Sequence, residues 1–560
     1  FFMNQKTRRA ALLIVMCCMA VWASAQTMYD ALRFSENNYS GTARSYAMGN
    51  AFTALGGDLG GLTINPAGSA VASYSQVTIT PGINIVSTSA KGTKFGDLDT
   101  GFGRSLKSNK SKFSFPNLGF MINFDTGRKT GLKNASFGVV ANGTGFFNDN
   151  LQARGSNAYT SFMGSLAYQT NGIDIDALAM KDAYNNSSAP WQSILGYRAG
   201  LIANYGPASN RTEYIGTSEG FRYIGPEDGD RNDLHNYEIM QYGALDQNYG
   251  RLARGAKYDY LINFGLNISD RFYFGANLGI TSMEYFYHDW IKEAAQDPSL
   301  FPIVFHNEKG EVSGSTCFSD MEYHSKYEAV GVGVYGKFGF IVRPVAGLRI
   351  GGAIQTPTST RIKEYWHSSA ASYYTDGKYN VSDETPEGEY VYRLVSPFRF
   401  NIGLAYTFGK IGLISADYEM CNYSAMKFKE TSTIDNSVFD DGVNMDIKEY
   451  MGPSHMLRAG IEVKPLPVFA IRAGYGLQTS PEKYYDRNND IQYVKANRHS
   501  VSAGLGFTSN GSFFADLAFG ATKYPDEYIY PYGDYMDIPS PEILSKKWIY
   551  NVMLTLGFRF

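Results

Sequence analysis

The segment 216–220, Gly-Thr-Ser-Glu-Gly, has residue types and a spacing that could support acyl transfer. It fits the G-x-S-x-G pattern, in which a sharp turn between a strand and a helix exposes the serine as a nucleophile. His235 and several carboxylates follow it. No strand–turn–helix pattern surrounds the segment, however, so a hydrolase remains only an alternative and we assign no catalytic residue.

A second segment, 331–336, fits the G-x-G-x-x-G pattern of a phosphate-binding turn. That fingerprint needs a strand before it and a helix after it, because the N-terminus of the helix holds the phosphates. Here the glycines lie inside an alternating segment that reads as a strand. The sequence therefore predicts no nucleotide site.

Metal chemistry has equally little support. The segments 486–490 and 228–232 contain Asp and Asn at the spacing of a calcium loop, but both lack the closing bidentate glutamate. The seven histidines form no H-E-x-x-H pattern. We predict no enzyme activity, no metal and no cofactor, and leave open whether a loop binds calcium.

Alternation with a period of two residues dominates the remaining sequence. Every second residue from Trp548 to Phe560 is apolar or aromatic. Such segments exceed the about 5–6 residues of an average strand and carry aromatic residues at their ends, which favours transmembrane barrel strands of about ten residues. Fourteen segments of this kind are predicted, at about 75–89, 112–126, 134–149, 256–268, 271–288, 318–340, 346–365, 390–408, 411–431, 447–464, 467–480, 497–510, 511–524 and 547–560.

The connections between these segments alternate in length. Tight turns follow every second segment, as at Ser269-Asp270 and Gly409-Lys410, whereas the others are long, the largest from about 150 to 255. This asymmetry is typical of a bacterial outer-membrane barrel with both termini in the periplasm. We predict an all-β membrane protein with a 14-stranded antiparallel transmembrane β-barrel at 73–560. It must be closed, because an open sheet edge would leave unpaired backbone groups in lipid.

Composition and the N-terminus agree with an exported membrane protein. The net charge is −3 and the mean hydropathy is −0.26, so nothing indicates a nucleic-acid partner. Residues 1–25 have the pattern of a signal peptide, with basic residues, an apolar stretch and an Ala23-Ser24-Ala25 cleavage site. Beyond it, no apolar run approaches the about 20 residues of a membrane helix. Whether the remaining Cys317 and Cys421 pair is left open.

Residues 26–72 precede the first strand and have no strand pattern of their own. Barrels of about eight strands are filled by their side chains, whereas those of sixteen to eighteen enclose a channel, so a barrel of fourteen strands needs a plug. The segment Asn65-Pro66-Ala67-Gly68 combines a turn with small residues that fit a confined space. We predict that 26–72 forms a plug inside the lumen. The alternative is an ordered periplasmic tail.

The segment 43–55, ARSYAMGNAFTAL, followed by Asn65–Gly68, resembles the N-terminal hatch of FadL-type outer-membrane transporters. In that family an A-M-G-x-A-F-x-A run leads to an Asn-Pro-Ala motif. The segments SPFRFNIGLAY at 396–406, ISADYEMCNYS at 414–424 and LRAGIEVKPLPVFAIRAGYG at 457–476 resemble hairpins of the same family. The long segment from about 150 to 255 resembles nothing we recognise.

The resemblance implies a monomeric barrel for passive, gated uptake of hydrophobic molecules, such as long-chain fatty acids or aromatic hydrocarbons. In the family, movement of the hatch frees the ligand, and a bend in the third strand opens a lateral gap. The candidate residues are Phe34, Tyr46, Met48 and Phe52 for the ligand path, and Asn142, Gly143 and Gly145 for the bend. As alternatives, the first four simply pack against the wall and the glycines make room for the plug. A surface-interaction barrel (an adhesin or part of a receptor) and a polar-solute porin are the competing functions.

The last strand carries a further expectation. Its aromatic face, with Tyr550, Phe558 and the terminal Phe560, predicts a signal for the barrel assembly machinery. We expect this strand to close the barrel against the strand near 75–89. Besides a hydrophobic ligand and this machinery, outer-membrane lipid is the expected partner.

Overall fold

The computed structural model describes residues 26–560 except 94–101, 104, 206–210, 227–236, 307–311, 432–436, 487–489, 510–511 and 535–539. The expected signal peptide, the calcium-like segment 228–232 and His235 lie outside the described residues.

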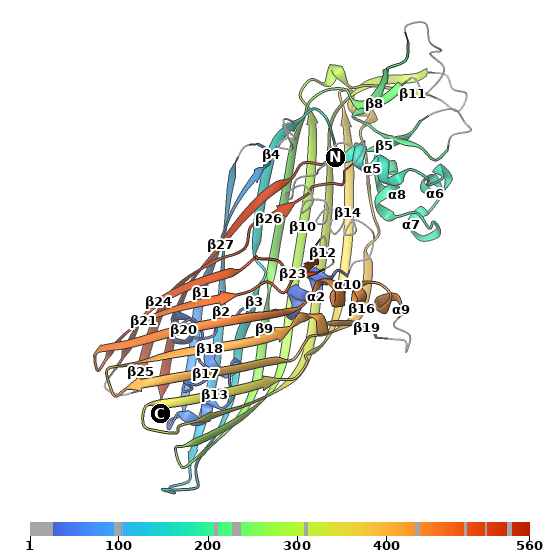
Figure 1. Cartoon of the computed structure of the whole chain (residues 1–560). Coiled ribbons are helices and arrows are strands. Elements are labelled where there is room, and N and C mark those ends of the chain that lie inside the picture. The colour runs from blue at the N-terminus through green and yellow to red at the C-terminus, as the bar shows by residue number, and fades with distance from the viewer. Residues whose placement is uncertain are drawn as a thin grey trace.

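The wall of the molecule is a closed antiparallel β-barrel of fourteen strands (Figure 1). In order around the wall these are β1 (Gln76–Gly92), β2 (Leu106–Asp125), β3 (Leu132–Phe146) followed by β4 (Asp149–Asn157), β9 (Leu245–Ile268), β10 (Phe272–Ala295), β12 (Val312–Val342), β13 (Leu348–Gln355) with β14 (Ser359–Tyr374), β16 (Gly388–Val395) with β17 (Arg399–Phe408), β18 (Gly412–Asn422) with β19 (Lys427–Glu430), β20 (Pro453–Leu466), β21 (Phe469–Gln478), β24 (Arg498–Thr508), β25 (Phe513–Lys523) and β27 (Ile543–Arg559). β27 pairs with β1, Phe558 opposite Val77, and so closes the barrel as predicted.

The two faces of the wall differ in polarity. Large apolar side chains are exposed on the outer face and form an apolar belt, on β12 for example Val330, Val332, Val334, Phe338 and Phe340. Inward-facing residues are buried and polar or charged, among them Asn263, Asn277, Lys337, Asn401, Glu419, Arg458 and Glu462. This arrangement inverts that of a soluble protein and is typical of a transmembrane barrel with a plugged polar lumen.

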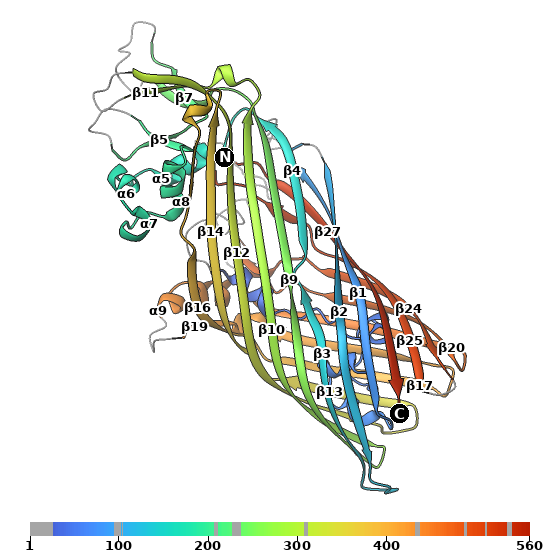
Figure 2. The ribbon, with the colours of Figure 1, turned by 180° about the vertical axis from the view of Figure 1, so that it is seen from behind.

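The two ends of the barrel also differ. At the end that we call the turn end, Ser269 and Asp270 join β9 to β10 with φ of 59° and 53°. Positive φ at both central residues is typical of the two-residue type I′ turn, which matches the twist of the strands. At the opposite loop end, β9, β10, β12 and β14 rise well beyond the apolar belt on one side of the molecule (Figure 2).

Several predicted segment boundaries at the loop end were wrong. β14 ends at Tyr374 rather than near 365, and β10 ends at Ala295 rather than near 288. β9 begins at Leu245 rather than near 256, because its alternation continues beyond the belt with polar residues. The tenth strand begins at Pro453 rather than near 447, because 443–450 form helix α10.

A separate lobe covers the tall side of the wall at the loop end. It contains α5 (Phe162–Thr170), α6 (Ile175–Ala179), α7 (Ala183–Asn186), α8 (Trp191–Arg198), β5 (Ile202–Asn204), β6 (Tyr214–Gly216), β7 (Glu219–Tyr223) and β8 (Tyr237–Gln241). Leu166, Ile194 and Leu195 of this loop-end lobe pack in one apolar core with Phe318 and Tyr374 of the wall. Within the described ranges, no helix is long and apolar enough to cross a membrane.

The remaining short elements lie in the connections. They are η4 (Pro298–Leu300), β11 (Pro302–His306), η5 (Gly377–Tyr379), β15 (Val381–Glu384), η6 (Tyr423–Ala425), α9 (Ser437–Asp440), α10 (Val443–Tyr450), β22 (Lys483–Tyr485), β23 (Ile491–Tyr493) and β26 (Glu527–Ile529).

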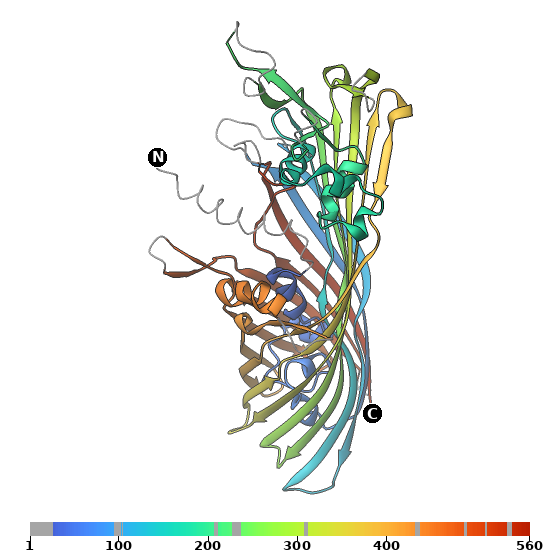
Figure 3. The same cartoon turned by 90° about the vertical axis from the view of Figure 1, so that its right-hand side faces the viewer.

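The N-terminal segment lies inside the barrel, where Figure 3 shows it in blue. It contains α2 (Met28–Ser35), α3 (Ala43–Ala47), η2 (Gly60–Thr63) and α4 (Gly68–Val71). α2 begins at a capping box in which Thr27 and Asp30 satisfy each other's backbone N–H groups. We call this segment the plug.

Candidate functional site in the plugged lumen

Asn65 joins the turn of the plug to the wall. Its side-chain Oδ1 accepts from the backbone N–H of Ala67 at 3.0 Å, which fixes the turn around Pro66. Its Nδ2 donates to Thr53 O at 2.6 Å within the plug and to Phe340 O of β12 at 3.1 Å. Asn65 is fully buried. One side chain therefore satisfies backbone groups of both the plug and the barrel.

Glycines of the wall give the plug the room it needs. Gly265, Gly275 and Gly339 lie directly opposite one another on β9, β10 and β12. A Cβ at Gly275 would lie 2.3 Å from the carbonyl carbon of Pro66, and one at Gly339 would lie 2.0 Å from Asn65 Oδ1. Because real Cβ atoms do not approach so closely, any side chain here would displace the plug. Further inward glycines that contact the plug in this way are Gly351, Gly403, Gly460, Gly474, Gly504 and Gly520.

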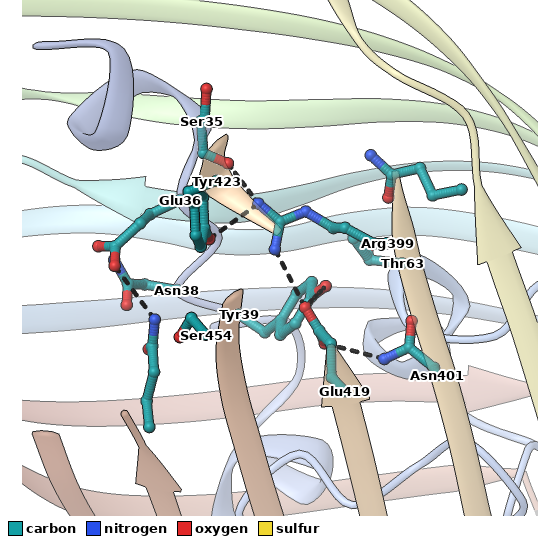
Figure 4. A network of polar contacts seen from close by, with 12 residues as sticks. Ser35, Glu36, Asn38, Tyr39, Thr63, Arg399, Asn401, Glu419, Tyr423 and Ser454 are labelled. Atoms are coloured by element: carbon teal, nitrogen blue, oxygen red, sulfur yellow. Dashed lines mark hydrogen bonds and ion pairs between the residues drawn. The ribbon is translucent and has the colours of Figure 1, made fainter. Parts of the chain in front are cut away.

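A buried ion network faces the end of α2, as Figure 4 shows. Arg399 donates to Glu419 Oε1 at 3.1 Å and to the backbone carbonyl of Ser35 at the end of the helix. Its Nη2 also contacts the hydroxyl of Tyr423 at 3.3 Å. Glu419 in turn accepts from Asn401 Nδ2 at 2.8 Å. A wall guanidinium thus holds a carbonyl at the C-terminus of α2, where positive charge is favourable.

Two more ion pairs link the plug to the wall. Arg498 of β24 contacts Glu36 Oε2 at 3.0 Å and donates to Asn38 Oδ1 at 2.7 Å. Arg44 of α3 contacts Glu462 Oε2 of β20 at 3.0 Å. Ion pairs therefore hold the plug to the wall in addition to apolar contacts such as those of Leu59 and Leu62 with Met121.

The four side chains proposed for a ligand path do not meet. Met48 and Phe52 pack together inside the plug with Leu55 and Ile64. Tyr46 packs with Ala518 and Met553 of the wall, and its hydroxyl accepts from Asn551 Nδ2 at 2.8 Å. Phe34 belongs to a different, larger cluster. That these four residues form a ligand path stays a prediction.

The cluster around Phe34 is the apolar part of the lumen. We call it the aromatic cluster, and its buried members are Met28, Ala31, Phe34, Ala253, Met283, Tyr285, Ala329, Ile362, Tyr392, Leu394, Cys421, Tyr423, Met426, Phe428, Phe439, Ile447 and Met451. Phe34 contacts the rings of Phe147 and Tyr285 edge to face, with centroids 6.3 and 5.8 Å apart. Sequence reasoning missed the wall residues. Their only signal is an apolar residue at an inward position of an alternating strand.

A small cavity of mixed polar and apolar lining lies between the plug and the wall. Its volume is about 120 Å³, and it lies between 37–40 of the plug and β20, β21 and β24 of the wall. Arg458 lines it, and this buried guanidinium forms an ion pair with Glu419 at 3.1 Å. Tyr46 is among the residues that line this cavity.

The hydrogen-bond ladder of the wall is interrupted between β2 and β3. The pairing ends at Asn117 opposite Asn142. Beyond it, the carbonyls of Gly143 and Thr144 accept from the backbone N–H groups of Ser40 and Asn38 of the plug, at 3.1 and 2.7 Å. A register shift against β9 falls between Gly143 and Gly145.

Gly143 thus sits where wall and plug exchange hydrogen bonds. A Cβ there would lie 2.6 Å from Ser40 Oγ, so this glycine also makes room for the plug. Asn142 is tied to the plug too, because its Nδ2 donates to Thr63 Oγ1 at 2.7 Å. That these residues form a lateral opening stays a prediction.

Where the structure describes them, the motifs considered for other chemistry have no supporting geometry. Ser218 lies in the turn between β6 and β7, fully buried, and its Oγ contacts Ser161 Oγ at 3.1 Å. The segment 331–336 lies within β12. Cys317 and Cys421 are both free. Among the described residues, no group of three or more His, Cys, Asp or Glu is placed to hold a metal ion.

The fold is similar to that of several solved outer-membrane channels. A TodX monoaromatic hydrocarbon channel carrying the deltaS2 mutation is 12% identical, the match covers 93% of this chain and 98% of that one, and the TM-score is 0.50. The P. putida toluene transporter TodX is 12% identical over 93% and 99% of the two chains, with a TM-score of 0.49. A Pseudomonas aeruginosa FadL homologue is 11% identical over 94% and 99%, with a TM-score of 0.47. Comparison with family models and with curated proteins finds no match.

Proposed function

We propose that this chain, whose barrel has the FadL-type fold, takes up hydrophobic small molecules passively across the outer membrane of a Gram-negative bacterium. The loop end would face outward and both termini the periplasm, because short turns are periplasmic in such barrels. The observation that carries the proposal is the plug with the aromatic cluster beside it. The lumen is filled rather than open, and its apolar part is contacted by α2.

In this proposal the ligand enters at the loop end and competes with Phe34 for the aromatic cluster. Aromatic side chains bind apolar and aromatic molecules through large contact areas. Displacement of α2 would break the contact between Arg399 and Ser35 O, which couples ligand binding to movement of the plug. The arrangement favours this reading over a polar-solute porin, which would need a continuous polar channel.

The exit that we propose is lateral, at the interruption between β2 and β3. Residues 106–114 of β2 pair with β1, whereas the ladder to β3 stops at Asn117. Phe113 and Phe115, on the outer face next to the interruption, are exposed at 58% and 49%. A hydrophobic molecule leaving there would enter the membrane without crossing water.

Transport into proteoliposomes tests the proposal. We expect uptake of labelled toluene or labelled oleate above that of protein-free vesicles, and no uptake of labelled maltose. Gly143→Leu should reduce uptake, because a side chain there meets Ser40. Gly336→Leu, at an open position of β12, is the control. Uptake of maltose at the rate of toluene and oleate would support a porin and contradict the proposal.

A further inference from the structure

Three basic residues lie directly opposite one another on neighbouring strands of the wall. Arg361 of β14 is opposite Arg393 of β16, which is opposite Lys429 of β19. All three side chains are exposed. The residues that follow Arg361 and Arg393 and precede Lys429 belong to the buried aromatic cluster, so the alternation of the strands directs the basic side chains outward. We call these three residues the basic row; its strands lie side by side in Figure 1.

The charge of the basic row is not balanced by neighbours. No ion pair or side-chain hydrogen bond joins any of the three to another described residue. The next basic residues along the same strands differ, since Lys363 contacts Glu389 at 2.9 Å and Lys427 contacts Asp440 at 3.1 Å. Like charges directly opposite on a sheet, with Cβ atoms about 4.5–5.5 Å apart, destabilise it. An anion that contacts all three would remove this cost.

The basic row also lies at a boundary of the apolar belt. Arg361 is opposite Val332 of β12, a belt residue that is 55% exposed. On the next part of the wall, Phe398 and Phe400 are exposed at 59% and 44%, whereas Arg393 is on the loop-end side of them. Side chains at such a boundary are at the level of the lipid headgroups.

We propose that the basic row binds the phosphate of a phosphorylated glycolipid in the outer leaflet. Arginine presents two parallel N–H donors to phosphate oxygens, and lysine adds a third charge-assisted contact. Basic clusters next to a membrane-spanning segment recognise lipid headgroups in this way. The leaflet rests on the orientation proposed above. The site itself does not depend on transport.

Native mass spectrometry tests the site on the full-length barrel in detergent. The probes are bisphosphorylated lipid A, its dephosphorylated form, phosphatidylglycerol and inorganic phosphate. The test variant is Arg361→Gln/Arg393→Gln/Lys429→Gln. The matched control is Lys363→Gln/Lys427→Gln, which removes two basic residues from the same strands that already have partners. Heat-modifiable migration in gels confirms that each variant is folded.

We expect the parent and the control to retain bisphosphorylated lipid A, and the test variant to retain roughly tenfold less, as loss of charge-assisted contacts implies. Equal retention by the test variant and the parent would overturn the proposal. So would equal retention of the dephosphorylated form, or binding of inorganic phosphate without lipid. Retention of phosphatidylglycerol in preference to lipid A would overturn the glycolipid assignment and place the row at the other leaflet. If the chain fails to transport hydrophobic molecules, each of these lipid-binding outcomes keeps the same meaning.

Discussion

The side-chain amide of Asn65 donates to the backbone carbonyl of Phe340, 3.1 Å away, and so joins the plug to strand β12 of the barrel. The same amide also donates to Thr53 O inside the plug. Replacing Asn65 with alanine removes the link to β12 and leaves the buried Thr53 O without this donor, which costs about 1–3 kcal/mol for an unsatisfied group.

We therefore predict that Asn65→Ala loosens the plug while the barrel stays folded. Limited proteolysis should cleave residues 26–72 faster than in the parent, with unchanged heat-modifiable migration. Asn185→Ala, an exposed asparagine of the loop-end lobe, is the control and should behave like the parent. If the plug of the Asn65 variant were as resistant as that of the parent, Asn65 would not be the link described here.

Gly275→Val should displace the plug more strongly than the loss of Asn65. The added Cβ alone would lie 2.3 Å from the backbone of Pro66. Relief of this clash requires a shift of the backbone of the plug or of the strand. Single-channel recordings in planar bilayers should give openings that the parent lacks. Gly336→Val adds the same side chain at a position with nothing closer than 3.8 Å. Closed recordings from both variants would argue against close contact between plug and wall.

Glu419→Gln tests the ion network. Glu419 forms ion pairs with both Arg399 and Arg458, at 3.1 Å each, and all three are buried. Breaking a buried pair by removing one charge costs about 3–5 kcal/mol, because the other charge is left uncompensated. We predict faster hydrogen exchange in α2, which Arg399 contacts at Ser35. The double variant Glu419→Gln/Arg399→Gln, which also loses the contact with Ser35 O, should exchange at least as fast as Glu419→Gln. Parental exchange rates in both variants would mean that the network does not hold the helix.

The loop-end lobe should dock in a pH-dependent manner through Glu293. This carboxylate lies at the loop end of β10, beyond the apolar belt, and accepts from Phe162 N at 2.8 Å and Gln247 Nε2 at 2.6 Å. Burial raises the pKa of Glu293 from 4.5 to about 7. Because the pKa of Glu293 is raised in the folded state, its contribution to the stability of lobe docking is complete below pH 4.5. This contribution is lost as the pH rises through 7.

We therefore expect hydrogen exchange at the start of α5 to increase between pH 4.5 and 7, after correction for the intrinsic rate, and then to level off. Glu293→Gln should remove this change, because the amide stays neutral. Glu328→Gln, exposed on β12, should keep it. A pH profile shared by Glu293→Gln and the parent would assign the change to another group.

The barrel could be predicted from the sequence because the pattern that marks each strand lies within the residues of that strand. In lipid the outward residues of each strand must be apolar, so alternation such as that from Trp548 to Phe560 marks each strand, and short turns such as Ser269-Asp270 order the strands. The loop-end extension of β9 was missed because its two faces do not differ in polarity: its buried positions include Gln247 and Arg251 beside Leu245 and Tyr249. α10 was missed because Val443, Met445 and Ile447 alternate with polar residues, a pattern that favours a strand.

The site was predictable only in part. Asn65 and Pro66 could be identified because the conformational preferences that form a turn belong to these adjacent residues themselves. The partners of that turn, Phe340 and Gly275, lie far away in the sequence. A glycine inside a strand does not indicate which segment of the chain packs against it. Met48 and Phe52 were proposed for the ligand path on residue type alone, and apolar side chains of a plug serve its own packing first.

The central claim is that residues 26–72 close the lumen, and the conductance of a barrel without them tests it most directly. Deletion of residues 27–68, with the signal peptide retained, should leave a folded barrel, because β27 and β1 close the wall without contribution from the plug. Its single-channel conductance should rise from near zero to a stable open level. A folded deletion variant that conducts no more than the parent would contradict the claim and, with it, the proposed gating by the plug.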